Sequence, residues 1–216
     1  MLDLRAAYRA WASFRGAGPA TRAFLLARLV NAPLGPLDAD LRALRGRVLS
    51  LGAGYGLIER YLTELNPGVA VEGVELDASR VAVAAACPSP RVSVRNADVR
   101  DLPEAGAFSA VLAVDVLHHI ALDDHGPILR ALADRLEPGG LCLVKDIAVT
   151  PTWKHAWNRA HDRLVTGSGD VSCREPEDMA RLLGGAGLTV EGVRRLSPAS
   201  PYPHYLVRAR RPSARG

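Results

Sequence analysis

One short stretch, residues 48–56, constrains the fold more than any other part of the chain. It reads Val-Leu-Ser-Leu-Gly-Ala-Gly-Tyr-Gly, so a mostly apolar run enters a glycine-rich turn, and an apolar helix start follows at Leu57 and Ile58. A buried strand, a tight turn and a helix form the opening of a nucleotide-type α/β site. Glycines suit this turn because it is tight and because a ligand must approach bare backbone.

The spacing of the glycines distinguishes two kinds of nucleotide site. They stand at positions 52, 54 and 56, and Leu57 occupies the place of a third dinucleotide-fingerprint glycine. A pyrophosphate-binding loop requires Gly-x-Gly-x-x-Gly, so the spacing disfavours a dinucleotide. For these residues taken alone, an ordinary strand-to-helix turn stays open as an alternative, since short glycine motifs are weak signals.

Acidic residues follow the next two predicted strands. The run 69–77 reads as a second strand that ends in acid, with Glu75 and Asp77, and a carboxylate at the tip of this strand can accept hydrogen bonds from both hydroxyls of a ribose. Val92 and Val94 predict a third short strand, which is followed by Asp98. The Asp98 carboxylate could accept a hydrogen bond from an exocyclic amine.

Two further strands continue the alternation of strands and helices. Residues 110–115 predict a fourth strand that ends in Asp115 and runs into a segment with the pair His118 and His119. The Glu-Pro-Gly-Gly sequence at 137–140 is expected to end a helix and to open a fifth strand over 141–146.

In this order the segments resemble the class I S-adenosylmethionine-dependent methyltransferases. The similar segments are VLSLGAGYG, GVELD, RNADVRDLP, FSAVLAVDVLHHI and LEPGGLCLVKDI, which span about residues 46–149. The resemblance implies an α/β fold with a doubly wound, seven-stranded, mostly parallel sheet, the Rossmann-like methyltransferase fold. It also implies that the seventh strand is inserted antiparallel beside the fifth.

The resemblance implies S-adenosyl-L-methionine as the cofactor and a set of residues that would hold it. These residues are Gly52, Ala53, Gly54, Tyr55, Gly56, Glu75, Leu76, Asp77, Asp98, Val99, Asp115 and Val116. The turn glycines and Ala53 would hold the methionine end, and Glu75 the ribose hydroxyls. Tyr55 stands where Thr or Ser is frequent in relatives, and it could lie across the cofactor or point toward the substrate.

The remaining residues of this set would contact the adenine and the methionine amine. Leu76 or Asp77 would lie near the adenine edge. Asp98 would accept from the adenine amino group, with the Val99 backbone beside it. Residues 115–116 would lie near the methionine amine or the sulfonium.

Catalysis needs little beyond in-line positioning, plus a base if the acceptor carries a proton. His118 and His119 are the candidate bases, because a histidine can take a proton near pH 7; alternatively, they only shape the loop. The pairs 161–162 (His-Asp) and 145–146 (Lys-Asp) are lesser candidates, and an ion-paired strand end explains Lys145 better. No metal site is predicted, because sequence-adjacent histidines rarely share one metal.

The chain is expected to contain an N-terminal helical lid at 1–45, a methyltransferase domain at 46–210 and a flexible tail at 211–216. Residues 4–14 and 21–30 read as helices. The apolar stripe of the second helix is expected to dock on the core, or else to face a lipid or an interface, where Arg22 and Arg28 could meet an acidic head group. A helix over 151–164, with Trp153 and His155, would form a substrate wall.

Composition narrows the class of protein further. The formal net charge is +4, but the cations are scattered and no basic run alternates with aromatics, so nucleic acid is disfavoured as a partner. Three cysteines without metal or disulfide spacing favour a reducing, cytoplasmic location. No run reaches the roughly 18 apolar residues of a membrane span, although peripheral membrane contact stays open. The sequence does not indicate the oligomeric state.

We therefore expect a methyltransferase acting on a small-molecule acceptor, lipid-like or from secondary metabolism, with oxygen favoured over nitrogen or carbon. Two alternatives remain. A NAD(P)-dependent oxidoreductase is disfavoured by the glycine spacing, and a noncatalytic scaffold protein is disfavoured by the intact Glu75 and Asp98.

Overall fold

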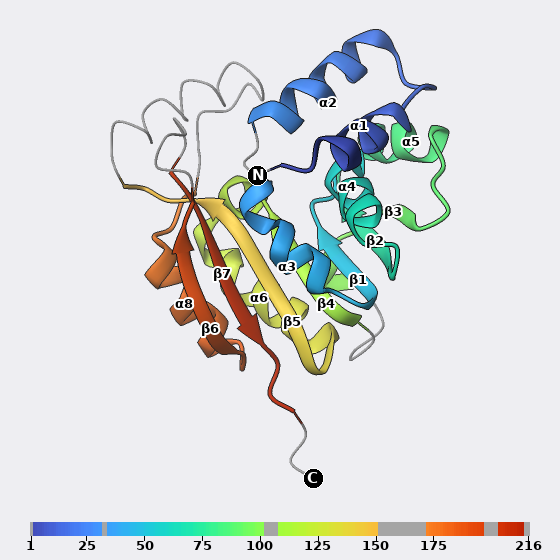
Figure 1. The fold of residues 1–216 in the computed structure, drawn as a ribbon. Coiled ribbons are helices and arrows are strands. Elements are labelled where there is room, and N and C mark those ends of the chain that lie inside the picture. Colours follow the sequence, from blue (N-terminus) through green and yellow to red (C-terminus); the bar gives the residue numbers. More distant parts are fainter. Residues whose placement is uncertain (1, 32–33, 102–107, 151–171, 197–202, 214–216) are drawn as a thin grey trace. The chain divides into compact units, whose positions relative to one another are not determined.

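The computed structural model describes residues 2–31, 34–101, 108–150, 172–196 and 203–213 (Figure 1). The chain forms two compact units, Met1–Pro103 with Phe108–Ala110, and Glu104–Ala107 with Val111–Gly216. No helix in the described residues is long and apolar enough to cross a membrane.

The first unit holds the glycine-rich turn and the N-terminal helices. Its elements are α1 (Leu4–Ala12), α2 (Pro19–Asn31), η1 (Gly35–Leu37), α3 (Asp38–Ala43), β1 (Gly46–Leu51), α4 (Leu57–Leu65), β2 (Val69–Glu75), α5 (Ala78–Ala86), β3 (Val92–Asn96) and η2 (Val99–Asp101). Strand β2 pairs in parallel with β1 and with β3. The short helix α3 was not predicted from the sequence.

Strand β4 (Phe108–Val114) begins in the first unit and ends in the second. The other described elements of the second unit are η3 (Leu117–His119), α6 (Leu122–Arg135), β5 (Leu136–Ile147), α8 (Pro176–Gly185), β6 (Thr189–Arg195) and β7 (His204–Arg210). Helices α6 and α8 pack against each other, and α8 also packs against β6 and β7.

The strands form one seven-stranded sheet in the order β3-β2-β1-β4-β5-β7-β6. Strand β7 is antiparallel to both β5 and β6, with a bulge between Val190 and Gly192. The predicted fold class is therefore confirmed, including the insertion of the last strand beside the fifth.

The predicted boundary at residues 137–140 is wrong. Helix α6 ends at Arg135, and β5 already begins at Leu136 and continues to Ile147. Gly139 has a φ of 80°, and its amide donates a hydrogen bond to the Arg211 carbonyl at 3.0 Å. Because Gly139 pairs with the residue that follows β7, the Pro-Gly-Gly sequence at 138–140 forms part of β5.

The two predicted N-terminal helices are confirmed as α1 and α2, and α1 is anchored to α4 within the first unit (Figure 1). The Asp3 amide donates to the Tyr61 hydroxyl at 3.1 Å, and this hydroxyl donates to Asp38 Oδ1 at 2.7 Å. Arg60 is only 3% exposed; its guanidinium donates to Ser13 Oγ at 2.9 Å and lies 4.3 Å from the centre of the Phe14 ring. These contacts hold the N-terminal segment on the flank of α4.

Candidate active site

The glycine-rich turn joins β1 to α4 and has an unusual backbone. Gly52, Gly54 and Gly56 have φ values of 63°, 56° and 80°, in the left-handed region that L side chains rarely adopt. Gly56 is also the N-cap of α4. The backbone conformation of the turn therefore favours glycine at these three positions, whether or not a ligand binds there.

The turn lies directly on β2. The Ala53 amide donates to the Val74 carbonyl at 3.1 Å. A Cβ atom added at Gly73 would lie 2.5 Å from the Ala53 Cβ, which is too close for any two carbon atoms. Glycine at position 73 thus lets the turn approach the strand, a requirement that was not predicted from the sequence.

Glu75, at the end of β2, is buried and fixed by backbone donors. The Gly54 amide donates to Oε2 at 2.8 Å, and the Asp77 amide donates to Oε1 at 2.9 Å. Each carboxylate oxygen has two lone pairs, so each can accept one further hydrogen bond. Two vicinal hydroxyls are the kind of group that suits such a fixed pair of acceptors.

Asn96, at the end of β3, is a positioning residue that sequence reasoning missed. Its Nδ2 donates to the carbonyls of Glu75 and Leu76 at 2.9 and 2.8 Å, and the Ala97 amide also donates to the Glu75 carbonyl at 3.2 Å. These bonds fix the backbone that carries the Glu75 carboxylate. A polar side chain at the end of a parallel strand was the available signal.

Leu76 and Asp77 follow the same strand end but differ in role. Leu76 is 70% exposed, so its apolar side chain is available to a planar ligand. Asp77 is the N-cap of α5, where Oδ1 accepts from the Ser79 amide at 2.8 Å and from its hydroxyl at 2.6 Å. The bonds from Ser79 lower the pKa of Asp77. Helix capping therefore accounts for this aspartate without a ligand.

Asp98 immediately precedes η2, which begins at Val99. Arg100 donates to both Asp98 oxygens, from Nε to Oδ1 at 3.0 Å and from Nη2 to Oδ2 at 2.6 Å, and these bonds lower the pKa of Asp98. Val99 is 1% exposed, so only its backbone is available to a ligand. The assignment of Asp98 to an adenine amino group stays a prediction, and Arg100 competes for the same oxygens.

Tyr55, in the turn, contacts the N-terminal helix α2. Its ring meets that of Phe24 edge to face, with the ring centres 5.9 Å apart. This places α2 next to the glycine-rich turn within the first unit.

In the second unit, Asp115 follows β4 and belongs to a buried charged cluster. It is the one non-glycine residue with a positive φ, 52°, in the described part of the chain. Lys145 Nζ donates to Asp115 Oδ1 at 2.5 Å, and His204 Nδ1 lies 3.2 Å from the same Nζ. Burial and the nearby Lys145 charge lower the pKa of His204. The ion pair expected at Lys145 is confirmed, whereas His204 was missed.

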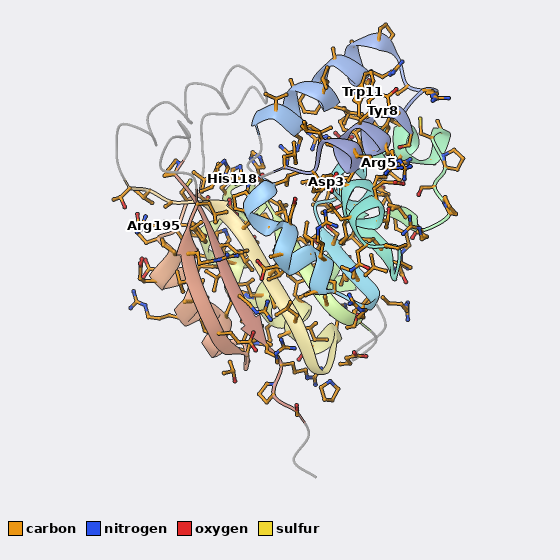
Figure 2. The ribbon with its side chains drawn as sticks, in the orientation of Figure 1. Asp3, Arg5, Tyr8, Trp11, His118 and Arg195 are labelled. Atoms are coloured by element: carbon orange, nitrogen blue, oxygen red, sulfur yellow. The ribbon has the colours of Figure 1, made fainter. Side chains whose placement is uncertain are left out.

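His118, also in the second unit and labelled in Figure 2, is paired with Asp146. Its Nδ1 bonds Asp146 Oδ1, and its backbone amide donates to Oδ2 at 3.2 Å. The His118 side chain is 4% exposed. His119 is exposed, and its ring centre lies 4.0 Å from that of His118. The two histidines therefore differ in burial: His118 is buried and held by the Asp146 carboxylate, whereas His119 is exposed.

The sequence did not predict these partners. Lys145 and Asp146 do not pair with each other, because adjacent residues of a strand point to opposite faces. Lys145 meets Asp115, and Asp146 meets His118. The predicted helix over 151–164, with its His161 and Asp162, lies outside the described residues. Within the described residues, no group of three or more His, Cys, Asp or Glu is arranged to hold a metal ion.

The residues of the first unit fit a nucleoside cofactor. The Glu75 carboxylate is fixed at two oxygens, and a Cβ atom added at Gly54 would lie 4.0 Å from Glu75 Oε2, so the glycine leaves bare backbone beside the carboxylate. Leu76 is exposed next to it. This combination of hydroxyl acceptors, bare backbone and an apolar side chain suits an adenosine.

Known proteins agree with this interpretation. A family model described as a methyltransferase domain matches residues 21–193. The trans-aconitate 2-methyltransferase of Pseudomonas aeruginosa strain UCBPP-PA14 is 33% identical over 139 residues, covering 63% of this chain and 48% of that protein. The chain thus spans about half the length of the curated relatives it matches.

Solved structures share the fold at low sequence identity. An S-adenosylmethionine-dependent methyltransferase from Mesorhizobium loti has a TM-score of 0.68 and 21% identity, covering 84% of this chain and 99% of that one. The [4+2]-cyclase SpnF has a TM-score of 0.68 and 18% identity, covering 84% and 80%. At this identity the similarity shows the fold alone.

The fold and the turn therefore define a protein of the class I S-adenosylmethionine-dependent methyltransferase type. The chain belongs to the methyltransferase domain family, whose cofactor is S-adenosylmethionine.

Proposed function

We propose that this protein transfers a methyl group from S-adenosylmethionine to an oxygen atom of a small acceptor, with His118 as the general base. The observation that carries the proposal is the pairing of His118 with Asp146. Oxygen is favoured because an alcohol or phenol must lose a proton when it is methylated. A nitrogen or carbon acceptor is the alternative.

The pairing defines which nitrogen of His118 can act. Because Nδ1 faces a carboxylate, this nitrogen carries the proton, and Nε2 keeps its lone pair. Asp146 also accepts from the His118 amide, so the carboxylate fixes both the ring and the backbone of this residue. A neutral imidazole with a fixed tautomer is the form that accepts a proton from a hydroxyl group.

The residues of the first unit supply cofactor binding in this proposal. Glu75 would accept from the ribose hydroxyls, the turn from Gly52 to Gly56 would hold the methionine end, and Leu76 would lie against the adenine. When bound, S-adenosylmethionine supplies an activated methyl group, so the protein need only position the acceptor and take its proton. Asp115 and Val116 are proposed to lie near the methionine amine.

A carboxylate acceptor is the second candidate, and the relative at 33% identity, a trans-aconitate 2-methyltransferase, favours it. A carboxylate is already ionised at neutral pH and needs no base. The two candidates therefore differ in whether activity depends on His118.

We further propose that residues 1–45 act as a lid, that 46–210 form the catalytic domain and that 211–216 form a tail. The contact between Phe24 and Tyr55 supports the lid, because it brings α2 to the cofactor turn. The three cysteines form no disulfide and fit a reducing, cytoplasmic location.

The test is a measurement of S-adenosylhomocysteine formation with two acceptor panels, hydroxyl compounds and carboxylic acids, over a range of pH. With a hydroxyl acceptor, His118→Gln should lower kcat by about 100-fold or more. Asp146→Asn should change the pH profile of kcat, because it removes the group that fixes the tautomer. His119→Gln is the matched control and should leave the pH profile unchanged.

The outcomes separate the candidates. Turnover of carboxylic acids that is insensitive to His118→Gln would overturn the base and favour the second candidate. Binding of S-adenosylhomocysteine without turnover of any acceptor would favour a scaffold protein. Binding of NADP alone would favour an oxidoreductase.

A further inference from the structure

Helix α2 presents an apolar surface to solvent. Every exposed side chain of residues 19–30 is apolar, and the largest are Phe24, Leu26 and Val30, which are 41%, 48% and 77% exposed. Leu25 and Leu29 are buried on the opposite side of the helix. An apolar helix face is normally buried against a partner, but apart from the contact of Phe24 with Tyr55 this face is open to solvent in the first unit.

The two arginines of α2 do not project from this surface. Arg22 and Arg28 are both half-buried, and the Arg22 guanidinium lies 4.4 Å from the centre of the Trp11 ring. Trp11 Nε1 also donates to the Arg22 carbonyl at 2.9 Å. This contact joins α2 to α1, so the two helices form one hairpin.

Helix α1 adds aromatic and basic groups to the same hairpin. Its buried side consists of Ala6, Ala7 and Ala10. Its outer side carries Leu4 and Tyr8, which are 76% and 63% exposed, and the exposed Arg5 and Arg9. Figure 2 labels Arg5 and Tyr8 on this helix. Leu, aromatic and Arg side chains together are typical of a helix that lies at a membrane interface.

The net charge of the chain is concentrated in this hairpin. Residues 1–31 contain five arginines and one aspartate, for a net charge of +4, and the whole chain has 27 basic and 23 acidic residues, also +4. The remaining residues thus carry 22 charges of each sign. Among the described residues, Arg5 and Arg15 form no ion pair, and Arg9 forms only an exposed one with Glu64 at 3.5 Å.

From these observations we propose that the α1–α2 hairpin docks on the surface of a bilayer with anionic head groups. The exposed apolar side chains of α2 enter the boundary between head groups and acyl chains, and Arg5, Arg9 and Arg15 bind the anionic head groups. Helix α2 has 13 residues, too few for the roughly 20 needed to span, so it lies in the plane of the interface. The proposal does not depend on which acceptor is methylated.

The charge and the apolar face of the hairpin argue against two other binding partners, a second copy of this chain and a nucleic acid. A second copy meeting this hairpin across a two-fold axis would oppose two regions of +4 each, and like charges disfavour such an interface. A nucleic acid would match the charge but not the exposed face of residues 19–30, which carries no charged side chain. Only a surface that is both anionic and apolar satisfies both features.

The test is co-sedimentation of the full chain with vesicles of phosphatidylcholine alone or mixed with phosphatidylglycerol. The parent protein should bind the mixed vesicles and be released by salt, since head-group attraction is screened. Replacing Arg5, Arg9 and Arg15 together by Gln should weaken binding on the order of 100-fold, because each basic residue near an anionic surface strengthens binding roughly five-fold.

Two further variants complete the design. Leu26→Glu with Val30→Glu changes exposed residues, so the fold should persist and vesicle binding should be lost. The matched control replaces Arg130, Arg181 and Arg194, which are exposed elsewhere, by Gln and lowers the net charge equally. This control should bind vesicles like the parent, and all variants should keep the parent's circular dichroism.

Three outcomes would overturn the proposal. One is an absence of binding to mixed vesicles at low salt, and another is an equal loss of binding in the control variant. The third is a dimer of the parent protein that the Leu26→Glu/Val30→Glu variant dissociates, which would assign this face to a second copy. None of them bears on methyl transfer to a soluble acceptor, which is measured separately without vesicles.

Discussion

Replacing Glu75 by Gln tests the cofactor site at its most constrained residue. The substitution keeps the size of the side chain and removes its charge. In the parent protein both carboxylate oxygens accept backbone hydrogen bonds, from Gly54 at 2.8 Å and from Asp77 at 2.9 Å. A Gln amide has one acceptor oxygen, so its NH2 group must face one of these backbone donors.

The magnitude follows from the number of hydrogen bonds. A bond to a charged acceptor contributes about 1.5–3 kcal/mol, and a neutral one about 0.5–1.5 kcal/mol. Of the two proposed ribose bonds, one is lost and the other is weakened. The binding free energy should therefore fall by about 3 kcal/mol, which raises the Kd on the order of 100-fold.

The assay is calorimetric titration with S-adenosylhomocysteine and with its 2′-deoxy analogue. The parent protein should prefer the ribose form, and Glu75→Gln should reduce this preference, because a neutral side chain with one acceptor oxygen replaces the carboxylate. Glu72→Gln is the matched control: it changes the same strand, but Glu72 pairs with Arg47 and Arg95 instead.

A Glu75→Gln variant that stays folded and discriminates between the two ligands as strongly as the parent would refute the ribose assignment. Equal losses for both ligands would instead indicate that the turn itself had collapsed. Circular dichroism at the titration temperature separates this second case from the first.

Three further predictions concern stability, measured by thermal unfolding. Gly73→Ala places a Cβ atom 2.5 Å from that of Ala53 and should cost about 1–3 kcal/mol, whereas Gly126→Ala, with open space around it, should cost nothing. Burial raises the pKa of Glu59, so ionisation of this carboxyl group opposes folding. Glu59→Gln should therefore stabilise the protein at pH 8 and not at pH 4. A difference in stability between variant and parent that is the same at both pH values would contradict this. Lys145→Met removes the lysine cation from the buried Asp115 carboxylate and should cost about 3–5 kcal/mol at pH 8. That cost should be smaller at pH 5.5. Loss of the neighbouring Lys145 charge raises the pKa of His204, so at this pH a protonated His204 can pair with the Asp115 carboxylate.

Much of the fold could be predicted because the signals for its strands and turns lie within short stretches of the sequence. The run of apolar residues before Gly52 and the acid at Glu75 lie within one segment each. The order of the strands in the sheet was implied by the resemblance of these segments to a known family. The N-cap role of Asp77 also depends only on the residues that follow it.

The partners of the site residues could not be predicted, because they depend on which strands are neighbours. His118 and Asp146 are 28 positions apart, and Asn96 meets the Glu75 carbonyl across 21 positions. Arg60 shows the same limit: an arginine in a helix suggests an exposed face, but it is buried between Ser13 and the carbonyl groups at the end of α5. The distribution of charge was also misjudged from the sequence. Arginines are scattered along the whole chain, and this obscured the excess of positive charge in residues 1–31.

The neighbours Lys145 and Asp146 make the register of β5 depend on charge. If the strand advanced by one residue, Asp146 would take the place of Lys145, and two carboxylates would face each other at Asp115. If the strand receded by one residue, Lys145 would take the place of Asp146 and lie beside His118. Val144 would then take the place of Lys145, and Asp115 would lose the lysine as its ion-pair partner. Hydrophobic alternation penalises a slipped strand through its apolar faces. Here each direction of slip also breaks two buried charge pairs, so misfolded pairings of this strand are selected against electrostatically.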